Sequence, residues 1–241
     1  MDLIDYNAKE PCENLAMDEF LLMEAERGEL GETFRVWESK EYFVVLGRAE
    51  KAEENCLMEN CSRGGIKVLR RISGGGTILQ GPGCLNYSAV LAYEKNEKFK
   101  NIITSYECIL GGISELLRGS GYDVKFLPIS DLAINNRKIS GNAQARKRKY
   151  FLHHGTFLYD FDIDRISNYL KHPPKEPAYR KGRGHAEFIS NIPIGKKRLE
   201  GILMGSFGSV SCIKTHFSVE GKLEKIIRAK YSLDEWNFYF A

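Results

Sequence analysis

Four strand candidates follow one another between residues 124 and 159, with no helical segment between them. They cover residues 124–127, 132–135, 138–145 and 151–159. Strands in such a run pair as antiparallel neighbours, whereas strict alternation of strands and helices would favour a parallel sheet. The run predicts an α+β protein with a mixed, mostly antiparallel β-sheet core flanked by helices.

Helices are expected on both sides of this run. Residues 102–118 repeat apolar side chains at three- and four-residue spacing, and residues 13–26 do so less regularly. Further helices are expected at 52–61, at 162–170 with Asp162 as its cap, at 196–207 and at 219–230. Further strands are expected at 33–37, 42–46, 67–72 and 85–92, and the aromatic tail 236–240 as a strand or extended cap.

The chain has 241 residues, of which 43% are hydrophobic and 28% charged, and this suits one catalytic domain over 1–241 without a separate accessory domain. The net charge of +3 gives no support for a nucleic-acid partner. The local basic run 146–149 is interpreted as a hairpin tip. The alternative is a docking patch for an acidic partner.

Nothing near the N-terminus resembles a signal peptide, and no segment approaches the roughly 20 apolar residues that span a bilayer. A cytoplasmic protein with no membrane partner is expected. The six cysteines form no C-x-x-C pair. Cys56 and Cys61 lack the second pair or histidine of a zinc site and are interpreted as reduced thiols on or near a helix.

The run 70–88 carries two arginines that lead directly into three consecutive glycines, Gly74, Gly75 and Gly76. Glycines let backbone amides curve closely around an anion, and guanidinium groups supply charge and paired donors. The run lacks the P-loop and the G-x-G-x-x-G pattern, so a nucleotide site here would be of another kind. An ordinary glycine-rich turn is the alternative.

A second polar stretch runs from residue 130 to 156. Asn135-Asn136 is typical of a tight hairpin turn, which places Lys138 at the start of the returning strand. Gly141 within that strand indicates close approach by a ligand, and Asp131 could hold a cation. An ammonium here suits a phosphate and a carbonyl oxygen undergoing acyl transfer, although a solvated strand lysine is the simpler alternative.

His153 and His154 are adjacent on a strand, so their side chains are expected on opposite faces. They are therefore poorly placed to bind one metal ion together. A packed, hydrogen-bonded histidine beside Gly155 is favoured over a histidine that lines a substrate tunnel.

Four motifs in this order resemble the lipoate-protein ligase family, within the wider biotin/lipoate ligase and octanoyltransferase superfamily. From the N-terminus they are N-L-A-M-D-E of the opening helix, R-R-x-S-G-G-G with L-N-Y-S, D-L-x-x-N-x-R-K-I-S-G-N-A-Q, and H-H-G-T-F-L. The resemblance runs from about residue 12 to 190. It implies the class II synthetase-like catalytic fold.

The resemblance also implies an activity. Such ligases use ATP and Mg²⁺ to convert lipoate to lipoyl-AMP, then transfer the lipoyl group to a lysine of a carrier domain, such as a 2-oxoacid dehydrogenase E2 or the glycine cleavage H protein. Lys138 would contact the acyl carbonyl and the adenylate phosphate, and Asp131 would be the magnesium or nucleotide partner. The other implied substrate- or nucleotide-binding residues are Arg71, Ser73, Gly74, Gly75, Gly76, Thr77, Asn86, Ser140, Gly141, Asn142, Ala143, His154 and Thr156.

Three departures keep alternatives open. Residues 80–84 replace a His-Asp pair that many members carry, and only about 40 residues follow residue 200, fewer than a usual accessory domain needs. A separate accessory subunit is therefore one alternative. Residues 126–140 also lack the cysteine of thioester-forming octanoyltransferases. An octanoyl or lipoyl transferase, with or without Cys84 as nucleophile, stays open, as do a biotin ligase and a non-enzymatic carrier-docking module.

Overall fold

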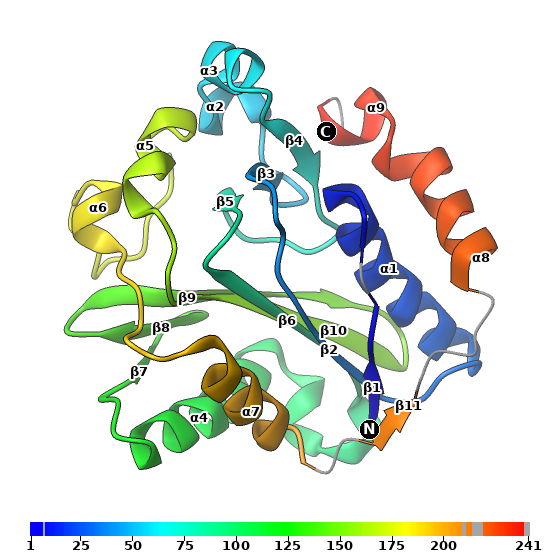
Figure 1. Ribbon diagram of the computed structural model, residues 1–241. Helices are drawn as coiled ribbons and strands as arrows, with labels where there is room; N and C mark the ends of the chain where they lie inside the picture. Colours follow the sequence, from blue (N-terminus) through cyan, green and yellow to red (C-terminus); the bar gives the residue numbers. More distant parts are fainter. Residues whose placement is uncertain (7, 209–210, 214–218, 239–241) are drawn as a thin grey trace.

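Two β-sheets and the helices around them make up the fold (Figure 1). The computed structural model describes residues 1–6, 8–208, 211–213 and 219–238. The strands are β1 (Asp2–Ile4), β2 (Thr33–Trp37), β3 (Phe43–Leu46), β4 (Lys67–Arg70), β5 (Ile78–Gln80), β6 (Cys84–Ala92), β7 (Lys125–Leu127), β8 (Asp131–Ile134), β9 (Arg137–Arg146), β10 (Tyr150–Leu158) and β11 (Ser211–Ile213). The helices are α1 (Pro11–Arg27), α2 (Ala52–Asn55), α3 (Met58–Arg63), α4 (Ile102–Gly119), α5 (Ile166–Tyr169), α6 (His185–Phe188), α7 (Lys196–Ser206), α8 (Val219–Ile226) and α9 (Asp234–Asn237), and a π-helical turn, Ile227–Tyr231, continues α8.

The larger sheet has the order β11-β1-β2-β6-β10-β9-β8-β7. Its pairs from β2 to β7 are antiparallel, and only β11-β1 and β1-β2 are parallel. The predicted mixed, mostly antiparallel sheet is therefore confirmed. The smaller sheet, β4-β3-β5, contains one parallel and one antiparallel pair.

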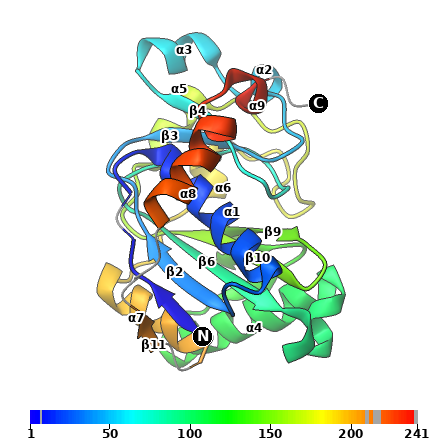
Figure 2. The same ribbon diagram turned by 90° about the vertical axis from the view of Figure 1, so that its right-hand side faces the viewer.

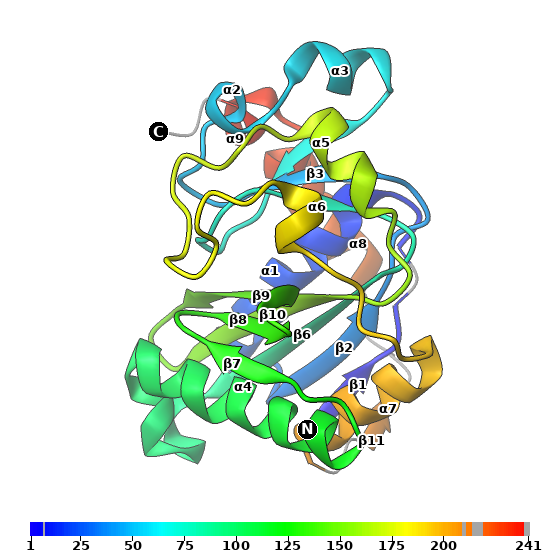
Figure 3. The same cartoon turned by 90° about the vertical axis from the view of Figure 1, so that its left-hand side faces the viewer.

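Helices cover both faces of the larger sheet. Helices α4 and α7 lie on one face, whereas α1 and α8 lie on the other (Figures 1 and 2). The smaller sheet packs on the same side as α1, as Figure 3 shows from the opposite direction. Strand β6 is buried along its whole length because both of its faces are covered. Side chains from β6, β8, β9 and β10 and from β3 and β5 of the smaller sheet line one common cavity.

The hairpin turn at Asn135-Asn136 is confirmed. Both residues have left-handed backbone angles, with φ of 51° and 57°, and they join β8 to β9. Asparagine tolerates this region better than most residues, and a two-residue turn of this kind matches the twist of the strands. The basic run 146–149 also lies at a hairpin tip, between β9 and β10.

Several local predictions were wrong. The single helix expected at 52–61 is two helices, because Cys56 adopts an extended conformation and forms a bridge with Leu170. Asp162 does not cap a helix, since its carboxylate instead accepts a hydrogen bond from Arg165. In the tail, residues 234–237 form helix α9 rather than a strand, and 239–240 lie outside the described residues. Strands β1, β5 and β11, of three residues each, were not predicted.

No helix among the described ranges is long and apolar enough to cross a membrane.

Candidate active site

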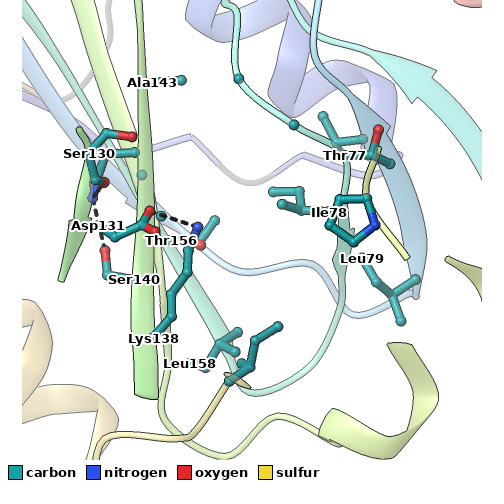
Figure 4. A pocket seen from close by; sticks show the side chains of 18 of the residues that line it. Thr77, Ile78, Leu79, Ser130, Asp131, Lys138, Ser140, Ala143, Thr156 and Leu158 are labelled. Atoms are coloured by element: carbon teal, nitrogen blue, oxygen red, sulfur yellow. Dashed lines mark hydrogen bonds and ion pairs between the residues drawn. The ribbon is translucent and has the colours of Figure 1, made fainter. Parts of the chain in front are cut away.

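A cavity of about 560 Å³ lies between the larger sheet and the glycine-rich loop. This volume is within the range of about 300–1,000 Å³ found for small-molecule sites. One wall comes from strands β6, β8, β9 and β10, and the opposite wall from residues 75–80. Figure 4 shows Thr77, Ile78 and Leu79 across the cavity from Asp131 and Lys138. A third wall, residues 171–189, comes from a stretch without regular periodicity.

An ammonium–carboxylate pair marks one end of the cavity. Nζ of Lys138 lies 2.7 Å from Oδ1 of Asp131 (Figure 4). The hydroxyl of Tyr179 donates a hydrogen bond of 2.8 Å to Oδ2 of Asp131. Burial and the charge of Asp131 raise the pKa of Tyr179, so this hydroxyl stays a donor. The Lys138 side chain is 28% exposed, which leaves its ammonium accessible to a ligand.

Gly141 lies opposite Asp131 in the β8-β9 pairing. A Cβ at this position would lie 2.8 Å from both Cε and Nζ of Lys138. The predicted close approach at Gly141 is therefore made by the Lys138 side chain itself. Because Gly141 has no side chain, the Lys138 ammonium has room to lie beside the Asp131 carboxylate.

The glycine-rich loop is held by Arg71. Its Nη2 donates to the carbonyl oxygens of Gly74 and Gly76, at 2.6 and 2.9 Å, and its Nε donates to the Ser73 hydroxyl at 3.0 Å. Gly75 has a φ of 84°, a region that favours glycine. Arg71 lines the cavity, but most of its donors bind the loop.

Arg70 does not reach the cavity, so the prediction of two guanidinium groups for one anion is wrong. Its guanidinium is buried and donates to the carbonyl oxygens of Gly47, Glu50 and Asn237, among others. Trp236 donates in return from Nε1 to the Arg70 carbonyl at 2.9 Å. Arg70 therefore joins the strand before the glycine loop to helix α9.

A buried chain of polar groups connects helix α1 to this loop. Oδ2 of Asp18 lies 2.9 Å from Nδ1 of His154, and Nε2 of His154 lies 2.6 Å from the Ser73 hydroxyl. The other oxygen of Asp18 accepts hydrogen bonds from Arg35 and Ser88. Burial raises the pKa of Asp18, but the hydrogen bond to His154 and the charge of Arg35 outweigh it and hold the pKa below its usual value. Asp18 is therefore an ionised carboxylate that orients His154.

The two histidines face opposite sides of β10, as predicted. His153 is wholly buried, where Nδ1 accepts from the Gln144 amide at 3.2 Å and Nε2 lies 3.0 Å from the Tyr87 hydroxyl. Burial lowers the pKa of His153 to about 3, so the ring is neutral. Tyr87 in turn donates to Oδ1 of Asn142, which lines the cavity. His153 thus acts as a structural residue behind the site.

Part of the cavity lining is apolar. Leu15, Trp37, Val45, Ile78 and Leu79 contribute to it, which suits an alkyl chain. Gln80 and Asn86 satisfy each other through two hydrogen bonds of 2.7 and 3.0 Å, and the amide of Asn86 also donates to the Cys84 carbonyl.

Cys84 is buried and lines the cavity. Burial and the nearby charge of Glu38 raise the pKa of its thiol far above the ordinary value, and no other cysteine whose side chain the structure describes lines the cavity. A thiolate, the form that attacks an acyl group, is therefore strongly disfavoured here.

Most of the residues implied by the resemblance line this one cavity. They are Arg71, Gly75, Gly76, Thr77, Asn86, Asp131, Lys138, Ser140, Gly141, Asn142, Ala143, His154 and Thr156. Ser73 lies beneath the loop against His154, and Gly74 is exposed and offers its carbonyl to Arg71. Asp18, Tyr179 and Arg180 were not predicted from the sequence as residues of the site. A motif signal existed for Asp18, which falls within the opening-helix motif 14–19.

The family model for the lipoyl protein ligase A/B catalytic domain matches residues 10–194. The chain belongs to this family and is thus an enzyme of lipoyl or octanoyl transfer. The octanoyltransferase LipM of Geobacillus kaustophilus is 27% identical over 269 residues, covering 98% of this chain and 96% of that protein. Lipoate–protein ligase 1 of Staphylococcus aureus is 26% identical over 243 residues, covering 96% of this chain and 71% of that protein.

Solved structures share the fold. The bipartite lipoate protein ligase from Thermoplasma acidophilum, studied with its E2 lipoyl domain, has a TM-score of 0.81 and 24% identity, covering 99% of this chain and 96% of that chain. A lipoate-protein ligase A bound with ATP has a TM-score of 0.80 and 22% identity, covering 100% of this chain and 99% of that chain.

Proposed function

We propose that this protein is a lipoate-protein ligase that activates lipoate with ATP and transfers the lipoyl group to a lysine of a lipoyl carrier domain. The observation that carries the proposal is the Lys138 ammonium, 2.7 Å from Asp131, in a cavity that is also lined by apolar side chains. Such a cavity suits an acid with a long alkyl chain whose carboxylate lies beside a cation.

Two reaction steps would use this arrangement. The carboxylate of lipoate attacks the α-phosphorus of ATP, and the bond to the bridging oxygen breaks, so that pyrophosphate leaves with the electron pair. The deprotonated ε-amine of the carrier lysine then attacks the acyl carbon, and the bond to the AMP oxygen breaks. Lys138 would donate hydrogen bonds to the phosphate and carbonyl oxygens on which negative charge grows in both steps.

Magnesium would be held at this site in the manner usual for nucleotide enzymes. Mg²⁺ is commonly held by one or two carboxylates together with substrate phosphates, and Asp131 would supply one such carboxylate. The part of the chain that the structure describes contains no cluster of three or more His, Cys, Asp or Glu side chains arranged for a metal. When bound, the ion would neutralise phosphate charge.

A thioester route finds less support in the cavity. An enzyme that forms an acyl-thioester needs a reactive thiolate, and the buried Cys84 with its raised pKa is a poor candidate. Octanoyl transfer remains the second candidate function, because relatives named octanoyltransferase align over nearly their full length.

The carrier would be a lipoyl domain, as for the archaeal bipartite ligase, whose structural report includes its E2 lipoyl domain. We propose that residues 1–241 form one catalytic unit that works in the cytoplasm, where its cysteines stay reduced. The proposed ligase carries out the activation step itself, without a separate accessory subunit.

A reconstitution experiment tests the proposed function. The purified protein is mixed with lipoate, ATP, Mg²⁺ and a lipoyl domain, and in parallel with octanoyl-carrier protein and the same domain without ATP. The ligase proposal predicts AMP and pyrophosphate release and a lipoyl mass increase in the first mixture only. Transfer in the second mixture alone would replace the ligase with the octanoyltransferase.

A further inference from the structure

Residues 171–189 form a charged wall of the cavity. The proposed role of Lys138 does not explain these charges. Lys171, Lys175, Glu176, Arg180 and His185 from this segment all line the cavity. Lys171, Lys175 and Arg180 are cationic, whereas Glu176 is the one carboxylate among these five residues. The wall formed by residues 75–80, by contrast, is apolar around Ile78 and Leu79.

Arg180 is the buried cation of this wall. Its side chain is 5% exposed, and its guanidinium stacks over Phe188 at 4.8 Å. Its Nε donates to the Arg183 carbonyl at 2.9 Å, yet its Nη2 is buried with no hydrogen-bond partner among the described residues. Buried guanidinium N–H groups normally have an acceptor. The unsatisfied nitrogen therefore indicates that an acceptor comes from a ligand.

Glu176 does not supply that acceptor. Its Oε2 lies 3.5 Å from Nε of Arg180, longer than a hydrogen bond, and its Oε1 accepts from the Gly182 amide at 2.8 Å. The carboxylate thus positions the loop and leaves Nη2 of Arg180 unsatisfied.

The wall is connected directly to the Lys138 end of the cavity. Tyr179, the residue before Arg180, donates to Asp131, and the amide of Ser190 donates to the Lys138 carbonyl at 2.9 Å. Arg183 holds the same segment to the hairpin turn by donating to the Asn136 carbonyl at 3.0 Å. Arg180 therefore belongs to a segment that is hydrogen-bonded to the strands carrying Asp131 and Lys138.

We propose that Nη2 of Arg180 binds the β- and γ-phosphates of ATP and then the pyrophosphate that leaves. This inference rests on the proposed ligase function. When the lipoate oxygen bonds to the α-phosphorus and the α–β bridging bond breaks, the electron pair and the negative charge pass to pyrophosphate. A guanidinium presents N–H donors in a fixed geometry that matches phosphate oxygens. Arg180 would thus act in activation and have no part in transfer from lipoyl-AMP.

The test separates the two half-reactions. Arg180→Gln removes the positive charge, and Arg180→Lys keeps a positive charge but lacks the paired N–H donors of the guanidinium. Lys181→Asn is the control, because Lys181 is exposed and does not line the cavity. Lys181 has a φ of 54°, which asparagine tolerates. For each variant, formation of lipoyl-AMP from ATP is compared with single-turnover transfer from preformed lipoyl-AMP to a lipoyl domain. Binding of inorganic pyrophosphate is measured by calorimetry.

Arg180→Gln is expected to lower kcat/KM for ATP and to weaken pyrophosphate binding, each by at least about tenfold, while transfer from lipoyl-AMP changes less than about twofold. Arg180→Lys should show the same selective loss to a smaller extent, which keeps the test valid if the glutamine variant does not fold. Lys181→Asn should match the wild type. Equal losses in both half-reactions, or unchanged pyrophosphate binding, would overturn the inference.

The experiment distinguishes failure of the inference about Arg180 from failure of the proposed ligase function. If the wild type forms no lipoyl-AMP, the ligase proposal fails irrespective of Arg180. Pyrophosphate binding that depends on Arg180 would still support the anion subsite, and its absence in the wild type would reject it.

Discussion

The carboxylate of Asp18 in helix α1 lies 2.9 Å from Nδ1 of His154 in strand β10. Because the ionised carboxylate only accepts, Nδ1 of His154 carries a proton, and Nε2 lies 2.6 Å from the Ser73 hydroxyl. Arg71 then donates to Ser73 and to the loop carbonyls. Helix α1 thereby fixes the glycine-rich loop through side chains far apart in sequence.

Asp18→Asn is expected to destabilise the protein by roughly 3–5 kcal/mol. The change leaves Arg35, whose side chain is fully buried, without its ion-pair partner. Urea denaturation gives the difference in free energy of unfolding. As a control, Asp162→Asn removes the exposed pair with Arg165, whose side chain is 45% exposed, and should change stability by less than about 1 kcal/mol. Equal effects of the two substitutions would contradict the role of Asp18.

Gly141→Ala should reduce lipoyl transfer by roughly 10²-fold, since a displacement of about 1 Å at a reacting group has this effect. The added Cβ would lie 2.8 Å from Nζ of Lys138, so the flexible lysine must move away from Asp131. The fold should survive, because only the end of a side chain is displaced.

Gly112→Ala is the matched control for this change. A Cβ at Gly112 meets nothing within 4 Å, and the residue lies within α4 on the other face of the sheet. Activity should be unchanged, and stability should rise by up to about 1 kcal/mol. Full activity in Gly141→Ala, with the melting temperature unchanged, would show that the place of the Lys138 ammonium does not matter.

Cys84→Ser and Cys84→Ala should both retain ATP-dependent lipoylation within about twofold, because the buried thiol with its raised pKa has no covalent role. Initial rates with a lipoyl domain measure this. Loss of activity in both folded variants would instead identify Cys84 as an acyl-carrying nucleophile.

His153 predicts a pH dependence of stability. Its pKa is about 3 in the folded protein, against about 6.5 when unfolded, so between these values the unfolded chain binds one more proton. The contribution of neutral His153 to the free energy of unfolding is fully present above about pH 6.5. It falls by about 1.4 kcal/mol for each pH unit below that value, down to about pH 3. His153→Gln should remove this slope between pH 6 and 5 in denaturation experiments. An identical slope in wild type and variant would mean that His153 is not the group that titrates.

The sequence was most informative where structure is local. The turn at Asn135-Asn136, the strands on each side of it and the opposite orientation of the two histidines follow from spacing along one chain segment. These segments also bring Asp131, Lys138 and Gly141 together. The polar end of the cavity was therefore largely predictable.

Long-range contacts were not predictable from spacing. Asp18 and His154 are 136 residues apart, and Arg70 and Asn237 are 167 apart. The two arginines suggested an anion site, but folding directs Arg70 to backbone carbonyls and Arg71 to the glycine loop. Tyr179 and Arg180 lie in a segment without periodicity, and only the packed chain shows that they line or support the cavity.

The most direct test of the account compares the wild type with Lys138→Ala and with Lys197→Ala, an exposed lysine of α7 on the opposite face of the sheet. Each protein is incubated with lipoate, ATP, Mg²⁺ and a lipoyl domain, and lipoyl mass on the domain and AMP release are measured together. The account predicts coupled lipoylation and AMP release in the wild type and in Lys197→Ala, and loss of both in a folded Lys138→Ala. Wild-type rates in Lys138→Ala, or lipoylation without AMP release, would contradict it.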